Sequence, residues 1–248
     1  VYNSRNTIID MYKDLNWNTD VIPALSKTEL ETIFNTYNTS DTLLQSFGDG
    51  IAFNMKIPHK IIENHNLVVI YYNFNNSDKK VQKITKGVVD KIANLYESDY
   101  LNHDDSLLII INEKQSNTTN KLIHSLNHKV KEDYEISKEL DKYIYKTESK
   151  IDDLKFNKNF FRHCMILNID MYQINLLKHD LVPKHEIISN PTMKKHILEI
   201  NNASENQLPI LNKHDNIAKL IRITEGDFCK ITRISEKTGE SIYYRICK

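Results

Sequence analysis

The sequence predicts an α/β protein (α+β overall), with an N-terminal α/β domain followed by a small mixed module that ends in a β-hairpin. Residues 67–72 and 107–111 are continuous apolar runs, which is typical of strands covered on both faces. Each run is followed by apolar residues at helical spacing, in 81–95 and 122–130. This alternation of covered strands and helices is typical of a sheet with parallel pairing.

Two helices and one half-buried strand are expected ahead of the covered strands. Apolar residues at helical spacing predict a helix over 7–15. Ser26 and Glu29 have the spacing of a capping box, so a second helix is expected to begin there. Residues 51–57 follow a glycine-containing turn and alternate in polarity, which predicts a strand. Together with the covered strands and their helices, these elements form a first domain over residues 1–130.

A charged segment over residues 131–165 is expected to link the two parts as a helical insert. Its apolar residues between 136 and 147 form one narrow stripe at helical spacing. Residues 148–150 have the Glu-x-Lys pattern of many nucleases, but they lie in the charged insert and not on a strand beside a second acidic residue, which argues against a nuclease site. After the insert, the alternating apolar residues change phase between Met171 and Tyr172, which predicts a bulge or a break in the linking strand.

Residues 166–248 are expected to form the second module. A short apolar strand is predicted over 174–177, and Pro183 keeps it from continuing as a central strand. Asn190 followed by proline predicts the start of a helix, in which Met193, Ile197 and Ile200 follow at helical spacing. Asp215 is expected to cap another helix.

A β-hairpin is expected to close this module, with a first strand over 227–234 and a turn at 237–239. Three apolar residues alternate on one face of the second strand: Ile242, Tyr244 and Ile246. Three others are expected on the opposite, outer face of the hairpin: Arg233, Tyr243 and Arg245. Arginine and tyrosine are favoured at protein interfaces, so an interface is the favoured interpretation of this face and plain surface is the alternative.

The composition excludes several classes of function. Lysine plus arginine and aspartate plus glutamate both number 33, so no global positive field favours nucleic acid. The three cysteines are widely separated and suit a reducing compartment, with neither a metal site nor a disulfide framework. No apolar run is long enough to cross a membrane, and the N-terminus lacks a signal-peptide pattern. A bias toward Asn, Lys, Ile and Tyr indicates an AT-rich genome, such as those of large DNA viruses and some protists.

No catalytic arrangement is recognisable in the sequence. The sequence contains no nucleophile elbow, no phosphate-binding glycine loop and no paired carboxylates at strand ends. Its five glycines offer few positions for a glycine-rich loop that binds phosphate. His179 and His185 flank a Leu-Val-Pro segment, but a metal pair would need two more ligands. Hydrogen bonds to backbone or to a partner are their favoured role. We therefore expect a binding or scaffold protein with no catalytic residue, metal, cofactor or small-molecule substrate.

Many residues of the last third stand in an order and spacing that is specific when taken together. They are His179, Leu181, Val182, Pro183, His185, Gln207, Leu208, Pro209, Asp215, Ala218, Gly226, Lys230, Ile231, Arg233, Ser235, Glu236, Gly239, Tyr244, Arg245, Ile246 and Cys247. With them, the stretch 174–248 resembles the fifth subunit of eukaryotic-type multisubunit DNA-directed RNA polymerases and its archaeal equivalent. Two departures stand out: Asn216 where the family has proline, and Arg222 where it has glycine, so we expect a remodelled loop at Arg222.

The resemblance implies a non-catalytic subunit of a DNA-dependent RNA polymerase, whose nucleotidyl-transfer chemistry and magnesium belong to its two large subunits. It implies docking of the C-terminal module on the largest subunit, among other polymerase subunits. The candidate partner-binding residues are His179, Leu181, Val182, Pro183, His185, Arg233, Tyr243 and Arg245.

The N-terminal domain resembles the jaw domain of the same family in its order of elements, which implies a lower-jaw position and weak contact with downstream duplex DNA within the complex. The candidate DNA-proximal residues are Lys79, Lys83, Lys86, Thr118 and Thr119. The three lysines form a stripe on a predicted helix. Asp90 follows on the same face and can pair with Lys86, which reduces the positive charge of the stripe. The solvated back of that helix is the favoured interpretation, with phosphate contact as the alternative. The two threonines fall where the family has a loop with a Thr-Pro pair, and the proline is absent.

A second class of function stays open: a free-standing α/β DNA-binding or nuclease-like protein that carries a polymerase-subunit-like C-terminal module. The lysine stripe is its best support, whereas the neutral overall charge argues against it. Under the polymerase hypothesis we expect an intracellular protein without membrane contact, located in the virion and host cytoplasm if its owner is viral and in the nucleus if it is cellular.

Overall fold

The computed structural model describes residues 1–37, 40–74, 84–114, 116–132, 157–235 and 239–248. Within these ranges the chain forms two compact units. The first unit contains the described residues up to 132 and the segment 161–175, and the second contains 157–160 and the described residues from 176 onward. The sequence predicts a boundary at residue 166, but the structure assigns 161–175 to the first unit. Most of the expected insert over 131–165 lies outside the described residues.

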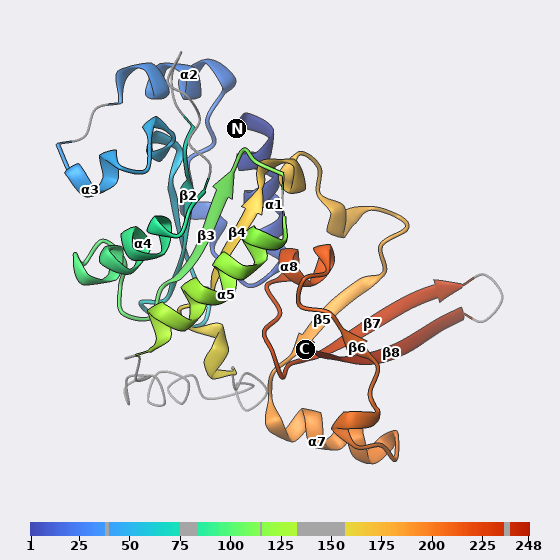
Figure 1. Ribbon diagram of the computed structural model, residues 1–248. Helices are drawn as coiled ribbons and strands as arrows, with labels where there is room; N and C mark the ends of the chain where they lie inside the picture. The colour runs from blue at the N-terminus through green and yellow to red at the C-terminus, as the bar shows by residue number, and fades with distance from the viewer. Residues whose placement is uncertain (38–39, 75–83, 115, 133–156, 236–238) are drawn as a thin grey trace. The chain divides into compact units, whose positions relative to one another are not determined.

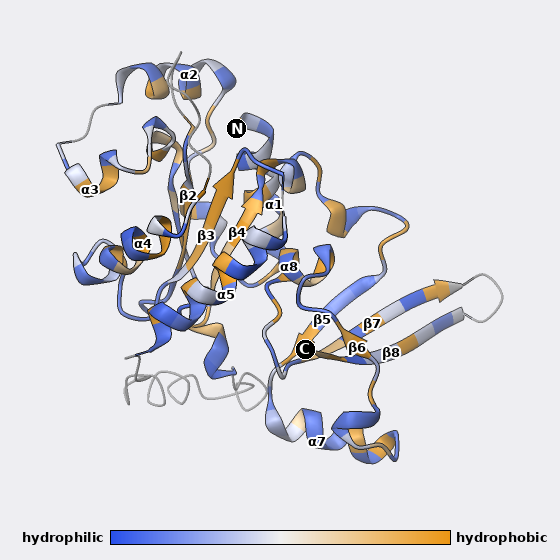
Figure 2. Ribbon diagram, in the orientation of Figure 1, coloured by the Kyte–Doolittle hydropathy of each residue, from blue (hydrophilic) through white to orange (hydrophobic). Residues whose placement is uncertain are grey.

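The first unit is built on a four-stranded sheet in the order β1-β2-β3-β4 (Figure 1). Its strands are β1 (Met55–Pro58), β2 (Asn66–Tyr71), β3 (Ser106–Ile111) and β4 (Cys164–Asn168). β1 pairs antiparallel with β2, whereas the pairs β2–β3 and β3–β4 are parallel. Every residue of β2, β3 and β4 is buried, and Figure 2 shows the apolar colour of β3 and β4. The prediction of two covered, parallel strands is confirmed, and β4 is a third.

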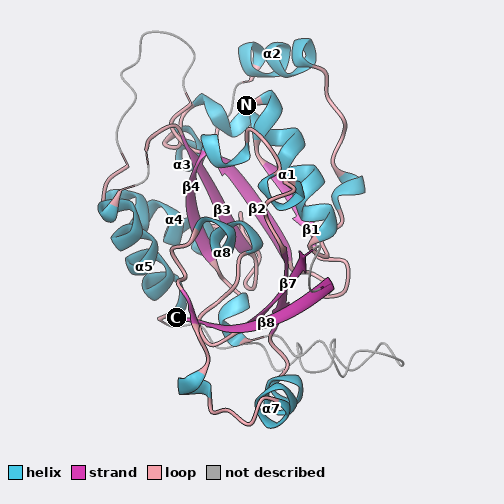
Figure 3. Ribbon diagram, turned by 90° about the vertical axis from the view of Figure 1, so that its right-hand side faces the viewer, coloured by secondary structure: helices cyan, strands magenta, loops and turns pink. Residues whose placement is uncertain are grey.

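Helices cover both faces of this sheet, which is why its strands are apolar throughout. In Figures 1 and 3, α4 (Gly87–Glu97) and α5 (Asn117–Lys131) lie on one face and α1 (Tyr2–Asp14) on the other. The hydroxyl of Tyr12 on α1 lies 3.3 Å from that of Tyr172, which belongs to the 3-10 helix η5 (Ile169–Tyr172) after β4. The break predicted between Met171 and Tyr172 occurs earlier, because β4 ends at Asn168 and both residues belong to η5.

The remaining elements of this unit are short: η1 (Thr19–Val21), α2 (Lys27–Thr36), α3 (Thr42–Gln45) and η2 (Asp49–Phe53). The predicted capping box is present, because Ser26 Oγ accepts a hydrogen bond from Glu29 N at 3.3 Å. The prediction of a strand over 51–57 is wrong for its first half, since Ile51 and Phe53 belong to η2. A Cβ on Gly50 would lie 2.6 Å from Tyr71 O, and this close backbone approach holds the chain in a tight turn.

The helix expected over 81–95 is also shorter than predicted. α4 begins at Gly87, Ile84 is buried ahead of the helix, and residues 75–83 lie outside the described part of the chain. The burial of Val88, Ile92 and Leu95 confirms the predicted apolar face.

The second unit is a smaller sheet in the order β5-β7-β8-β6. Its strands are β5 (Lys184–Ile188), β6 (Ile210–Leu211), β7 (Phe228–Ser235) and β8 (Gly239–Cys247). β7 and β8 form the predicted hairpin, with a register from Phe228↔Ile246 to Ser235↔Gly239. β5 pairs antiparallel with β7, and β6 pairs parallel with the end of β8. Short 3-10 helices complete the unit: η4 (Lys158–Phe160), η6 (Leu176–Lys178) and η7 (Glu205–Gln207).

Two helices lie on opposite sides of this sheet in Figures 1 and 3: α7 (Pro191–Ile200) and α8 (Asn216–Ile221). Both predicted caps are present, because Asn190 Oδ1 accepts from Thr192 N at 2.8 Å and Asp215 Oδ1 from Ile217 N at 2.9 Å. The apolar cluster on the α7 side consists of Ile197, Leu208, Phe228 and Ile246, with Ile188, Leu198 and Tyr244 packed against it. Of the three apolar residues expected on the buried face of α7, only Ile197 is buried, and Met193 and Ile200 are exposed.

The strand predicted over 174–177 is wrong. Ile174 is exposed, Leu176 begins a 3-10 helix, and the strand of this region is β5, which starts directly after Pro183. Proline has no N–H to donate within a ladder, and the pairing with β7 begins at the next residue, Lys184. The polar residues at the start of β5 conceal the strand in the sequence.

The C-cap of α8 is Arg222, at the position where the family has glycine, and its backbone conformation is left-handed. Arg222 has φ 59° and ψ 35° at the C-terminal end of α8, and its N–H donates to Lys219 O at 3.1 Å. Glycine adopts this left-handed backbone conformation at a lower free-energy cost than any other residue. The expected remodelling is therefore not needed, because arginine adopts the conformation that glycine favours.

Across the described residues, the structure contains no helix that is both long enough and apolar enough to span a membrane.

The burial of His59 makes stability depend on pH. The ring is 7% exposed, and its Nδ1 accepts hydrogen bonds from Ile61 N and Ile62 N, so the neutral form is favoured. Desolvation and then the nearby Lys60 charge lower the pKa of His59 from 6.5 to about 4. The folded state therefore binds fewer protons than the unfolded state between these values. The resulting stability is complete above pH 6.5 and is lost as the pH falls toward 4.

We expect the free energy of unfolding to fall by about 2 kcal/mol from pH 7 to pH 5 through this group alone. Urea unfolding at the two pH values measures the change. The control is His59→Asn, which keeps an acceptor at the equivalent position but does not titrate, so its fall should be smaller by that amount. Equal falls in both proteins would contradict the assignment.

Candidate interaction surface of the C-terminal module

The register of the hairpin places the predicted arginines and tyrosine on one face of the second sheet. Residues that are directly opposite in an antiparallel pair share a face, and the register pairs Arg233 with Ser241, Ile231 with Tyr243 and Cys229 with Arg245. Arg233, Tyr243 and Arg245 therefore lie on the same face, opposite Tyr244 and Ile246. This part of the prediction is confirmed.

The arginine face is exposed only along the half of the hairpin that is distant from the ends of β5 and β6. Tyr243 is 50% exposed and Arg233 is exposed, whereas Cys229, Ile231 and Cys247 on the same face are buried. The expectation that the whole face points outward is therefore correct for its distal half and wrong for its base. Burial raises the pKa of both Cys229 and Cys247 to about 12, so these two thiols stay protonated and inert.

Arg233 and Tyr243 contact each other directly across the two strands. The guanidinium carbon of Arg233 lies 5.3 Å from the centroid of the Tyr243 ring, in the geometry of a cation–π contact. Arg245 donates from Nη1 to Ile210 O at 3.2 Å. In the described part of the chain neither arginine forms an ion pair with a carboxylate. Two positive charges and an aromatic ring are thus available to a partner on this surface.

His185 extends the arginine face onto β5, because it pairs with Ile231 of β7. Its Nδ1 lies 2.6 Å from Pro183 O, so the neutral ring donates Nδ1–H to this carbonyl. Desolvation lowers the pKa of His185 most, and the charges of Arg233 and Arg245 add to this effect, whereas the hydrogen bond to Pro183 and the charge of Asp215 oppose it. His185 is therefore a neutral group that fixes the backbone at the start of β5.

His179 holds the exposed turn that precedes β5. Its Nδ1 accepts a hydrogen bond from Leu181 N at 3.2 Å, and its carbonyl accepts from Val182 N at 2.8 Å. The turn presents Leu181, whose side chain is 86% exposed, while Val182 and Pro183 are partly buried. An aliphatic side chain held in water by a rigid turn is suited to a pocket on a partner. The predicted hydrogen-bonding role of the two histidines agrees with this geometry, and the described residues contain no cluster of metal-binding side chains.

Exposed apolar side chains are concentrated in this second unit. Of the twelve large hydrophobic residues that are exposed in the described chain, eight belong to the smaller unit. They are Leu181, Ile187, Met193, Ile200, Ile210, Ile234, Ile242 and Tyr243. Scattered exposed apolar residues are ordinary, but this uneven distribution favours a binding function for the second unit over the first.

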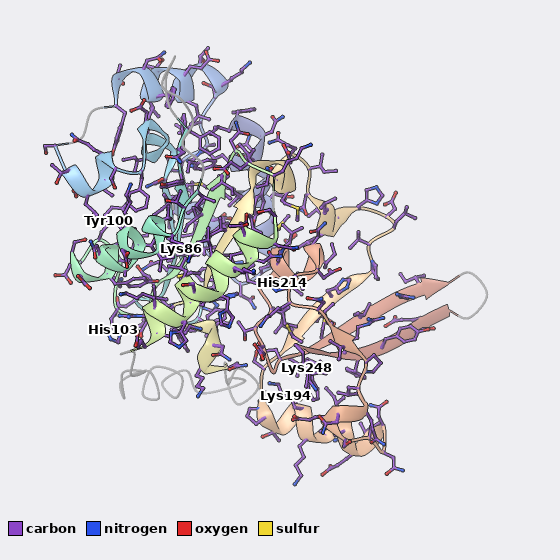
Figure 4. All side chains as sticks on the ribbon, viewed as in Figure 1. Lys86, Tyr100, His103, Lys194, His214 and Lys248 are labelled. Atoms are coloured by element: carbon purple, nitrogen blue, oxygen red, sulfur yellow. The ribbon has the colours of Figure 1, made fainter. Side chains whose placement is uncertain are left out.

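A buried ion pair that sequence reasoning missed anchors the base of the hairpin. Asp227 is 2% exposed and accepts hydrogen bonds from Lys194 Nζ at 3.3 Å and from Thr224 Oγ1 at 2.6 Å. Lys194, labelled in Figure 4, also donates to Gly226 O at 2.8 Å and lies 5.7 Å from the centroid of the Phe228 ring. The pair ties α7 to the residue directly before β7. Because 33 positions separate its members, the sequence alone gives no signal for it.

Most of the predicted lysine stripe lies outside the described part of the chain. Lys79 and Lys83 lie outside the described residues, and Lys86 is the residue before α4, not part of a helical face (Figure 4). Asp90, expected to pair with Lys86, instead pairs with Lys129 of α5 at 3.7 Å. The Glu-x-Lys pattern at 148–150 also lies outside the described residues. The stripe, which is the main support for a free-standing DNA-binding protein, therefore stays a prediction.

Thr118 and Thr119 lie in the first turn of α5, and not in a loop. Ser116 is the N-cap, and its Oγ accepts from Thr119 N at 3.3 Å. Thr119 is 3% exposed, so its side chain is not available for a contact with DNA in this structure, and its position near DNA stays a prediction. Thr118 is exposed and remains a candidate. Ser116 and Thr119 have the spacing of a capping box, so the sequence already indicated that a helix begins here.

The C-terminal unit matches known proteins along most of their length. Residues 174–247 match the family described as RNA polymerase Rpb5, C-terminal domain. The protein named DNA-directed RNA polymerase subunit Rpo5 from Methanosarcina barkeri is 42% identical over 76 residues, which cover 31% of this chain and 96% of the relative. The Rpo5 proteins of Archaeoglobus fulgidus and Sulfolobus acidocaldarius are 42% and 44% identical over 74 and 73 residues, or 30% and 29% of this chain and 96% and 86% of the relatives. A viral owner stays a prediction.

Removing the buried carboxylate tests the importance of the Lys194–Asp227 pair. We expect Asp227→Ala to lower the free energy of unfolding by about 3 kcal/mol, because Lys194 would keep a mostly buried charge without its partner. The control, Glu225→Ala, removes an exposed pair with Lys213 and should cost no more than about 1 kcal/mol. Chemical denaturation measures both, and equal effects would show that the buried pair has no special role.

Proposed function

Because this chain belongs to the family of the fifth subunit of multisubunit DNA-directed RNA polymerases, we propose that it docks on the largest subunit of such an enzyme through its second unit. The family residues lie in this unit, and the matched relatives are covered almost completely by it. As a family member, the chain is a structural and not a catalytic subunit. The nucleotidyl-transfer chemistry is accordingly assigned to the two large subunits.

The observation that carries the docking proposal is the face formed by the exposed Arg233 and Tyr243 and the partly exposed Arg245. The two arginines have no carboxylate partner in the described residues, and the aromatic ring between them is half exposed. Arginine and tyrosine contribute strongly to binding when a partner excludes water from them. Acidic side chains of the partner would complete the charge balance.

The turn at His179–Pro183 is the proposed second contact. The side chain of Leu181 is exposed and packs little against the rest of the free chain. The hydrogen bonds from Leu181 N and Val182 N hold the turn in one conformation. A preformed turn loses little conformational entropy on binding. Burying one leucine side chain contributes about 1.5–3 kcal/mol, which is enough to affect assembly measurably.

We propose that the first unit forms part of the lower jaw near downstream DNA. Its support is the order of its elements, with leading helices followed by alternating strands and helices. Among the candidate residues, Lys86 and Thr118 are the two described ones that are exposed. A neutral chain has no strong field for DNA, so the proposed contact is weak and depends on the assembled enzyme.

Charge reversal on the arginine face should weaken assembly without unfolding the protein. We expect Arg245→Glu to reduce the recovery of the two large subunits with tagged protein from its native source by at least about tenfold, with little change in melting temperature. Lys195→Glu on α7, whose side chain is 80% exposed, is the control and should keep normal recovery. Similarly, Leu181→Asp should reduce recovery, whereas Val21→Asp in the first unit should not. Unchanged recovery with Arg245→Glu and Leu181→Asp would contradict the docking surface.

Crosslinking tests the jaw position separately. A photoreactive residue in place of Thr118 should crosslink to downstream duplex DNA in the assembled polymerase, and the yield should decrease steeply with salt because phosphate contacts release counterions. The same group at Lys195 of the second unit is the control. Equal DNA crosslinking from both positions would contradict the jaw proposal while leaving docking intact.

A further inference from the structure

The outer edge of β8 has no neighbouring strand along most of its length. In the order β5-β7-β8-β6, the two-residue strand β6 pairs only with Ile246 and Cys247. Residues 240–245 pair with β7 on one side, and no strand in the described chain pairs with them on the other. The distal part of the hairpin extends beyond α7 and α8 (Figure 1). Six consecutive residues of regular strand therefore border an open edge.

The direction of the backbone groups along this edge follows from two hydrogen bonds at the base of β8. Ile246 N donates to Pro209 O at 3.0 Å, on the β6 side, and Cys247 N donates to Asp227 O at 2.8 Å, on the β7 side. Backbone groups alternate in direction along a strand. The N–H and C=O groups of Glu240, Ile242 and Tyr244 therefore face the open edge, in line with those of Ile246.

The edges of β4, β1 and β5 each carry features that disfavour strand pairing. Every residue of β4 is buried, and the side chain of Asn127 bonds both the N–H and the C=O of Cys164, at 3.0 and 2.7 Å. At the edge of β1, Pro58 O accepts from Asn18 N at 2.8 Å. The edge strand β5 carries Lys184 and Glu186, which pair at 2.7 Å, and charged residues are a common protection of edges.

The edge of β8 carries mostly apolar and aromatic side chains between two charged residues, Glu240 and Arg245. On the face of α7, Ile242 is 47% exposed, and Ile234, which lies on the same face of β7 two residues beyond the partner of Ile242, is 88% exposed. Figure 2 shows the apolar colour of this end of β7. On the opposite face lie Tyr243 and the two arginines. A strand added here would have one face against Ile242 and Ile234, with Glu240 beside them, and the other against positive charge.

We propose that β8 accepts an extended segment of a partner chain as an additional strand along residues 240–244, with acidic residues alternating with apolar ones. The proposal deepens the docking proposed above and rests on it for the identity of the partner as a polymerase subunit. The edge offers N–H donors and C=O acceptors in equal number, which another strand satisfies completely. A phosphate backbone would satisfy only the donors, so a nucleic acid is disfavoured. The carboxylates of the added strand would face Arg245 of β8, with Arg233 one strand further away on the same face.

Proline at the edge tests the backbone contact. Ile242→Pro removes an N–H that faces the open edge, and it leaves the hydrogen bonds to β7 in place, because those belong to the neighbouring residues. We expect recovery of the large subunits with the tagged chain to fall about tenfold, as for the loss of about one hydrogen bond. Ile242→Thr is the matched control, because it also loses aliphatic surface but keeps the N–H, and it should retain most of the recovery.

Amide hydrogen exchange gives a second readout that does not need a variant to fold. Resolved by residue, the amides of Glu240, Ile242 and Tyr244 should exchange rapidly in the free chain and at least about tenfold more slowly in the assembled polymerase. Those of Ser241, Tyr243 and Arg245, which face β7, should be slow in both. This alternation is specific to strand addition, since a partner that merely covers the face would not single out every second amide.

The outcomes separate the two proposals. Recovery of the large subunits with unchanged exchange at the three edge amides would overturn strand addition and leave docking intact. Equal recovery with Ile242→Pro and Ile242→Thr, both folded by circular dichroism, would do the same. Failure of the wild-type chain to recover the large subunits would overturn docking and, with it, strand addition.

Discussion

The pairing of β7 with β8 is the constraint on which the rest of the second unit depends. Its register runs without interruption from Phe228↔Ile246 to Ser235↔Gly239, and it decides which side chains share a face. Phe228 and Ile246 are placed toward α7, and the arginines toward the other side. Because the side-chain period of a strand is two, a slip of one residue would exchange the two faces completely. The same register decides which backbone groups face the open edge of β8.

The two ends of this hairpin serve different purposes. At its base, the apolar cluster under α7 and the buried Lys194–Asp227 pair hold the strands in place. Toward the distal end burial decreases on both faces, so that Ile234 and Tyr243 are exposed on opposite sides. Stability thus comes from one half, and the other half is available for binding. A small module that assembles with large partners is expected to show this division, because an interface residue cannot be buried in the free chain.

The first unit follows a different physical logic. Its central strands are buried on both faces, and some of its buried polar groups are hydrogen-bonded between distant parts of the chain. Asp105, for example, is fully buried and accepts hydrogen bonds from Asn66 N at 2.8 Å and Asn102 N at 3.0 Å. Such a unit is suited to act as a rigid body. The first unit exposes fewer large apolar side chains than the second unit. This agrees with a proposed contact to DNA that depends on the assembled enzyme and not on strong intrinsic affinity.

The sequence by itself determined the local features of this protein: the covered strands, the capping box at Ser26, the caps at Asn190 and Asp215, and the alternation along the hairpin that puts Arg233 and Arg245 on one face. These signals act over a few residues, so they can be read without knowledge of distant neighbours. Only the tertiary structure decided that the strand near Pro183 is β5, that Thr119 is buried, and that Lys194 pairs with Asp227. Each of these depends on a partner far away in the chain. The open edge of β8 likewise became visible only once the order of the strands was known, because an edge is defined by the absence of a neighbour within the described sheet.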